Sequence, residues 1–73
     1  MIKELDRVVL TRDFPEYHLK KGDLGTIVLV HEGNSGYEIE FMTLDGDTLN
    51  VVSLGTEDVR EIRKREIANA RVL

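Results

Sequence analysis

Short runs in which apolar and polar residues alternate recur along this chain, and they predict β-strands. The clearest is residues 37–41, Tyr-Glu-Ile-Glu-Phe, in which the aromatic and isoleucine side chains fall on one face and the glutamates on the other. A period of two residues is that of a half-buried strand. Apolar stretches rich in β-branched residues predict four further strands, at 6–11, 24–31, 48–53 and 59–62.

The segment between the first two predicted strands, residues 12–23, is a long loop. Pro15 excludes a central strand there, because proline has no N–H for a sheet hydrogen bond. Phe14, Tyr17 and Leu19 are apolar residues in polar surroundings. We expect these side chains to pack back onto the body of the domain.

The remaining connections are short and rich in turn residues. Residues 32–36, Glu-Gly-Asn-Ser-Gly, favour positive φ angles. Asp45-Gly46 predicts a two-residue type I′ hairpin turn with a positive φ at Gly46. Residues 54–59 predict one 3₁₀ turn, with Thr56 as its cap.

No two of these strands are separated by a convincing crossover helix, so we expect an antiparallel sheet. Five short antiparallel strands in so small a domain favour closure into a barrel, because closure removes exposed strand edges. The order of a long first loop, a three-stranded meander, one helical turn and a short last strand is that of an SH3-like barrel. We therefore expect an all-β, five-stranded SH3-like barrel over residues 1–62 and a basic tail over residues 63–73.

Gly22 and Gly25 flank Asp23 directly before the second predicted strand and raise the question of a phosphate-binding loop. A dinucleotide-binding fingerprint requires a helix after the glycines, whereas a strand follows here, and Asp23 would repel an anion. The structural explanation is favoured. We expect a positive φ at Gly22 and a bulge or close packing at Gly25.

Charge is distributed unevenly. Residues 22–59 contain eight acidic residues and no Lys or Arg, whereas residues 60–73 carry a net charge of +3, and the whole chain has −4. The tail contains good helix formers but is poorly amphipathic and too short to be a stable helix alone. We expect it either to fray or to dock, in helical or other form, on an acidic partner, on RNA, or on the acidic middle of a second copy.

Several motifs carry a resemblance to a known family. They are Leu-Asp-x-Val-Val-Leu-Thr at 5–11, Pro-Glu at 15–16, Leu-Lys-x-Gly-Asp-x-Gly-Thr-x-Val at 19–28, Gly-Tyr-Glu-Ile-Glu-Phe at 36–41 and Gly-x-Thr at 46–48. In this order the chain resembles a family of short stand-alone bacterial proteins, common in cyanobacteria and proteobacteria and catalogued as a domain of unknown function. The resemblance covers residues 2–62. It implies an SH3-like barrel and no established activity.

The composition argues against several kinds of site. The chain has no cysteine and two histidines, so we expect no metal centre and no cofactor. Asp45, Asp47 and Glu40 supply too few oxygens for a calcium loop. No serine lies beside a histidine in a recognisable catalytic arrangement, so we expect no enzyme. The N-terminus lacks the apolar region of a signal peptide and no run is long enough to span a membrane, so we expect a cytoplasmic protein.

The function that remains is protein binding without catalysis. We expect another protein as the partner, basic and encoded nearby, in an antitoxin-like, immunity-like or assembly role, and the tail also suits a homo-oligomer. The alternative is an RNA- or ribosome-associated barrel that uses the basic tail, which the acidic composition disfavours. The candidate partner-binding residues are Phe14, Tyr17, His18, Glu38, Glu40, Arg63, Lys64 and Arg65. For Phe14 and Tyr17, a place in the core is the competing interpretation.

Overall fold

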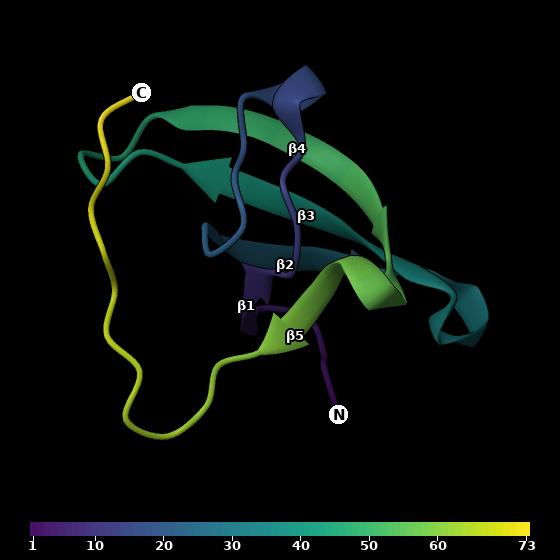
Figure 1. Cartoon of the computed structure of the whole chain (residues 1–73). Coiled ribbons are helices and arrows are strands. Elements are labelled where there is room, and N and C mark those ends of the chain that lie inside the picture. Colours follow the sequence, from purple (N-terminus) through teal and green to yellow (C-terminus); the bar gives the residue numbers. More distant parts are fainter.

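The computed structural model describes all residues, 1–73, and consists of one five-stranded antiparallel sheet without an α-helix (Figure 1). The strands lie at the five places that the sequence predicts, with bounds that differ by one or two residues. In chain order they are β1 (Arg7–Leu10), β2 (Leu24–Val30), β3 (Gly36–Met42), β4 (Thr48–Gly55) and β5 (Val59–Glu61). Across the sheet the order is β4-β3-β2-β1-β5. The predicted all-β antiparallel class is confirmed.

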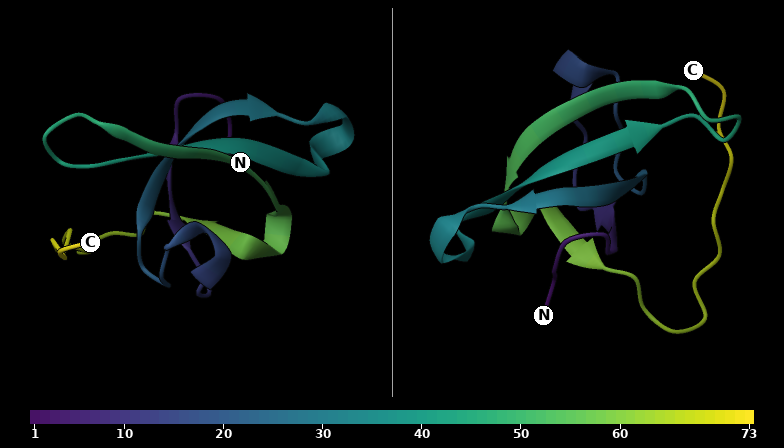
Figure 2. Two further views of the ribbon diagram at one scale, coloured as in Figure 1. Left: turned by 90° about the horizontal axis from the view of Figure 1, so that it is seen from above. Right: turned by 180° about the vertical axis from the view of Figure 1, so that it is seen from behind.

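The sheet is strongly curved but is not closed into a barrel (Figure 2). Strands β4 and β5 are its two edges and do not pair with each other. Strand β5 has three residues, and the register of the sheet pairs all of them with β1. The second edge of β5 pairs with no strand, so the ring stays open between β5 and β4.

The core lies on the inner side of this curve. The alternation predicted for β3 is confirmed, because Tyr37, Ile39 and Phe41 are buried while Glu38 and Glu40 lie on the outer side. The other strands contribute buried aliphatic side chains, namely Val8, Leu10, Ile27, Val52, Leu54 and Val59. Each fully buried side chain of this size contributes about 1.5–3 kcal/mol to folding.

The first loop is anchored to the core, as predicted. Phe14 and Leu19 form an isolated β-bridge, and both side chains are buried. Between them, Pro15 opens the 3₁₀ turn η1 (Pro15–Tyr17). Arg12 places its guanidinium carbon 3.9 Å from the centre of the Phe14 ring. The loop is thus a packed part of the domain.

The structure contains three 3₁₀ turns, where the sequence predicts one. The predicted turn is η3 (Thr56–Asp58), and the additional turns are η1 and η2 (Glu32–Asn34). The predicted Thr56 cap is wrong. The side chain of Asp58 caps η3 instead, because its Oδ2 accepts a hydrogen bond of 3.0 Å from the Gly55 N–H.

The β3–β4 hairpin also differs from the prediction. Gly46 has a φ of 101°, as expected, but Asp45 does not have a positive φ, so the turn is not of type I′. The Gly46 N–H donates to the carbonyl of Thr43, which closes a four-residue turn. Thr43 Oγ1 accepts a second bond from the Asp47 N–H, and this side chain stabilises the longer loop.

The tail is not helical. Residues 62–73 form no regular secondary structure and run in an extended path from β5 back along the molecule to the β3–β4 hairpin (Figures 1 and 2). No backbone–backbone hydrogen bond links these residues to the rest of the chain. The tail contacts the body of its own chain through Arg71, an arrangement that differs from the predicted docking on a partner, on RNA or on a second copy.

Candidate functional site

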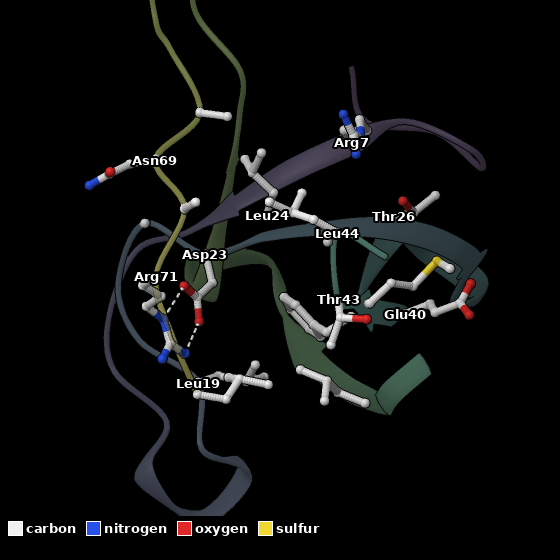
Figure 3. Close-up of a pocket in the computed structure, with 18 of the residues that line it drawn as sticks. Arg7, Leu19, Asp23, Leu24, Thr26, Glu40, Thr43, Leu44, Asn69 and Arg71 are labelled. Carbon is white, nitrogen blue, oxygen red and sulfur yellow. Dashed lines mark hydrogen bonds and ion pairs between the residues drawn. The ribbon is translucent and has the colours of Figure 1, made fainter. Parts of the chain in front are cut away.

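Two hollows lie on either side of the end of the tail. The first, of about 600 Å³, lies between β2, the β3–β4 hairpin and the tail (Figure 3). The second, of about 820 Å³, lies beside the first loop. Leu19, Leu49, Arg71 and Leu73 line both. The tail therefore divides one longer groove, which we call the tail groove.

The guanidinium group of Arg71 is the main contact between the tail and this groove. Its Nε donates to Asp23 Oδ1 at 2.8 Å, and its Nη2 donates to Asp23 Oδ2 at 2.6 Å (Figure 3). Nη2 also donates to the main-chain carbonyl of His18 at 3.0 Å. Both carboxylate oxygens thus bind along one edge of the planar guanidinium, the bidentate geometry in which arginine binds strongly, and the carbonyl oxygen binds a further N–H of Nη2.

The loop before β2 holds Asp23 in place. The Lys20 N–H donates to Asp23 Oδ2 at 2.8 Å, and the Asp23 N–H donates back to the Lys20 carbonyl at 3.0 Å. Gly22 makes this tight turn with a φ of 93°, as predicted. The Leu10 N–H of β1 donates to the Asp23 carbonyl, which joins the turn to the sheet. The carboxylate is therefore oriented by bonds that do not involve Arg71.

The environment of Asp23 favours its ionised form. Burial alone raises the pKa of this carboxyl group, but hydrogen bonds from the Arg71 guanidinium and the Lys20 N–H outweigh burial, so its pKa lies below the usual value. The same contact raises the pKa of Arg71. The pair is charged on both sides at neutral pH.

The remaining lining of the tail groove is part apolar and part charged, and it includes the basic residues Arg7 and Lys20. Leu24 and Leu44 flank the first hollow, and Glu40 and Asp45 line it too (Figure 3). The Leu44 side chain, at the tip of the hairpin, is 87% exposed. This combination suits an extended segment that carries both a cation and an apolar side chain.

Intramolecular contacts also shape the start of the tail. Arg60 makes two hydrogen bonds to the carboxylate of Glu66, at 2.9 and 2.7 Å. The Arg63 N–H donates to the same carboxylate. Arg65 has a φ of 64°, a left-handed conformation that is unfavourable for a residue with a Cβ. These contacts turn the chain back toward the groove.

The structure does not bring the eight predicted partner-binding residues together. Phe14 is only 2% exposed and packs in the core, and Tyr17 is partly buried against it. The carbonyl group of His18 lies at the groove, where it accepts a hydrogen bond from Arg71. Glu40 lines the first hollow and accepts a hydrogen bond from Thr48. Tyr17, His18 and Glu40 are thus the three predicted residues that line the tail groove.

The other four predicted residues lie elsewhere. Glu38, on the outer side of β3, accepts hydrogen bonds from Ser53 and from His31, which lower its pKa. Ser53 contacts the carboxylate and not the imidazole, so this cluster lacks the geometry of a nucleophile beside its base. The side chains of Arg63, Lys64 and Arg65 are exposed and form no ion pair. No group of three or more histidine and acidic side chains could share a metal ion.

Sequence reasoning did not identify the two residues at the centre of the site, Asp23 and Arg71. They are 48 positions apart, and each resembles many other charged surface residues. The one available signal was the opposition between an acidic middle and a basic tail. That signal indicates a docked tail without naming the pair.

Comparison with known proteins places the chain in a family. The model of the family described as "Domain of unknown function (DUF4926)" matches residues 4–61, so the chain belongs to this family. Comparison with curated proteins and with solved structures finds no match. The family match ends at β5 and does not include the tail. The chain contains no helix with the length and hydrophobicity for a membrane crossing.

Proposed function

We propose that this member of DUF4926 is a non-catalytic protein-binding module, which takes an extended segment of another protein into the tail groove. The observation that carries this proposal is the docked tail. An extended segment lies in the groove and is held by side chains, without backbone hydrogen bonds to the body. A segment of another chain with suitable side chains could therefore take the same place.

The charge of the groove supports a basic partner. Apart from Arg71 of the tail, the charged residues that line the first hollow are three acidic ones, Asp23, Glu40 and Asp45, and one basic one, Arg7, and the chain as a whole has a net charge of −4. Complementary charge steers association and selects against acidic partners. This agrees with the role expected from the sequence, that of an antitoxin-like, immunity-like or assembly partner of a basic protein.

The strand order also supports the proposal. A long first loop, a meander, a 3₁₀ turn and a last strand that pairs with the first form the connectivity of the SH3-like barrels that the sequence predicts. In such domains the first loop and adjacent strands commonly form the groove for extended peptides. We include this finer fold assignment in the proposal.

A second candidate is RNA binding, and one specific observation favours it. Arg63, Lys64 and Arg65 project from the start of the tail without acidic partners, so their charges are available to phosphate groups. The acidic groove and the negative net charge argue against it. We therefore rank it second.

Site-specific photocrosslinking in the native host separates these functions. A benzoylphenylalanine at Leu44, on the rim of the groove, should form an adduct with one discrete protein. The same probe at Leu5, which is also highly exposed but lines neither hollow, should not. A probe at Lys64 that gives a nucleic-acid adduct, with no protein adduct at Leu44, would favour the RNA alternative.

A further inference from the structure

We propose that Asp23 and the carbonyl group of His18 form a guanidinium-recognition site, which the partner fills with an arginine side chain. Arg71 is then an internal ligand that competes for the same site. This inference rests on the proposed function and specifies the chemistry of the partner. The family match, over residues 4–61, includes Asp23 and His18 but not Arg71.

The geometry selects arginine over lysine. The two oxygens of Asp23 engage Nε and Nη2 along one edge of the guanidinium plane, and the His18 carbonyl receives a further N–H from Nη2. A lysine ammonium is a point charge and cannot span both carboxylate oxygens with parallel bonds. The site therefore distinguishes two cations of equal charge.

Both halves of the site are held by contacts that do not involve Arg71. Asp23 is oriented by the Lys20 N–H, as described above. His18 has a left-handed φ of 59°, and its N–H donates to the Pro15 carbonyl at the end of η1. This conformation is uncommon for a residue with a Cβ, and the packed first loop maintains it. The carbonyl oxygen of His18 therefore has a defined position relative to the carboxylate.

The Asp23 side chain is only 19% exposed when Arg71 is bound. Arg71 itself covers both carboxylate oxygens, so its departure would open them to water and to another cation. A second guanidinium group could then make the same charge-assisted bonds. This couples release of the tail to binding of the partner.

The tail fills the guanidinium site but leaves much of the apolar groove uncovered. The Val72 side chain beside Arg71 is 95% exposed, and Leu44 on the opposite rim is 87% exposed. The tail also contains the unfavourable left-handed residue Arg65. A partner segment with an arginine in the site and an apolar side chain against Leu44 and Leu49 would bury more surface than the tail does. We identify this as the partner chemistry.

The test uses the full chain and a synthetic peptide with the sequence of residues 66–73, followed through the amide NMR shifts of Gly22, Asp23 and Leu24. The variant Arg71→Gln removes the guanidinium group from the site. The control variant Lys64→Gln removes one positive charge from the tail and leaves the contacts of the site in place. We expect Arg71→Gln to bind the peptide about tenfold more tightly than the wild type or Lys64→Gln, because the internal competitor is gone.

Two controls show whether the guanidinium group is recognised. A peptide with uncharged citrulline in place of its arginine should lose binding to Arg71→Gln by at least about tenfold, since charge-assisted bonds are lost. Adding Asp23→Asn to Arg71→Gln should have the same effect, while circular dichroism checks that the double variant is folded. Equal binding by wild type and Arg71→Gln, or equal binding of the two peptides, would overturn the proposal.

These outcomes are distinct from those that test the proposed function. A protein adduct at Leu44 combined with no preference for arginine would overturn the guanidinium site and leave the protein-binding module standing. Selective binding of the arginine peptide without any protein adduct at Leu44 would leave the site standing and count against the module.

Discussion

Arg12 Nε donates a hydrogen bond of 3.0 Å to Oδ1 of Asp58, and this bond joins the first loop to η3, 46 positions further along the chain. The other oxygen of Asp58 caps η3 through the Gly55 N–H. Asp58 is the one buried charged residue, with 8% exposure. It therefore connects the loop that borders the groove to the turn that precedes β5.

Replacing Asp58 with asparagine tests this connection. The variant retains one acceptor oxygen, so one of the two donors faces an NH₂ group. We expect the free energy of unfolding to fall by about 1–3 kcal/mol, the cost of an unsatisfied buried polar group. Urea denaturation measures this change in the free energy of unfolding. Asp47→Asn is the matched control, because the side chain of Asp47 makes no hydrogen bond, and no change beyond about 0.5 kcal/mol is expected there. Equal effects would contradict the role of Asp58.

Gly25 is required by close packing within the sheet. A Cβ at this position would lie 2.5 Å from Ile39 Cγ2 and 2.8 Å from Phe41 Cε1, and both side chains are buried. We expect Gly25→Ala to destabilise the domain by about 1–3 kcal/mol, because the core must shift to accept the methyl group. Thermal and urea unfolding would show the change.

Gly55→Ala is the control for this substitution. A Cβ there would approach only the flexible end of Glu57, at 2.8 Å, and this carboxylate can move aside. We expect a loss of less than about 1 kcal/mol. A Gly55 variant as unstable as the Gly25 variant would show that strand glycines matter here through the backbone and not through packing.

These residues show what the sequence could predict. The alternation at residues 37–41, the close packing at Gly25 and the positive φ angles at Gly22 and Gly46 are local properties, and all were predicted correctly. The predicted closure of the sheet into a barrel was not, because closure depends on whether the free edges of β4 and β5 meet in space, which no local pattern encodes. The two extra 3₁₀ turns are three residues each, too short for a periodic pattern.

The candidate site was predictable only in outline. The basic tail and the acidic middle are visible in the sequence, but the choice of Asp23 among eight acidic residues depends on the turn at Gly22 and on the position of the His18 carbonyl. The sequence makes Phe14 and Tyr17 candidates for binding because aromatic residues serve both in cores and in interfaces. Only the three-dimensional packing of the first loop distinguishes the two roles.

Glu66 gives the pH dependence of the turn that begins the tail. Hydrogen bonds from the Arg60 guanidinium and the Arg63 N–H lower its pKa to about 2 from an ordinary value of 4.5. A lowered pKa stabilises the folded form above the ordinary value, and this stabilisation is lost as the pH falls toward 2. Carboxyl ¹³C shifts should show a Glu66 midpoint near 2.

The variant Arg60→Gln tests the cause of this shift. We expect it to move the Glu66 midpoint upward toward 4.5, because the largest contribution to the lowered pKa is removed. Lys64→Gln is the control, since Lys64 makes no contact with Glu66, and its midpoint should stay near 2. A wild-type midpoint at the ordinary value would show that the Arg60–Glu66 contact does not persist in solution.

The account depends most on the docking of the tail by Arg71 and Asp23, and backbone {¹H}–¹⁵N NOE values for residues 68–72 at neutral pH measure it directly. We expect the wild type to give values close to those of the β-strands. In Asp23→Asn these values should fall to those of a free terminus, while Ile39 in β3 stays rigid. Low values in the wild type, or values that Asp23→Asn leaves unchanged, would contradict the docked tail.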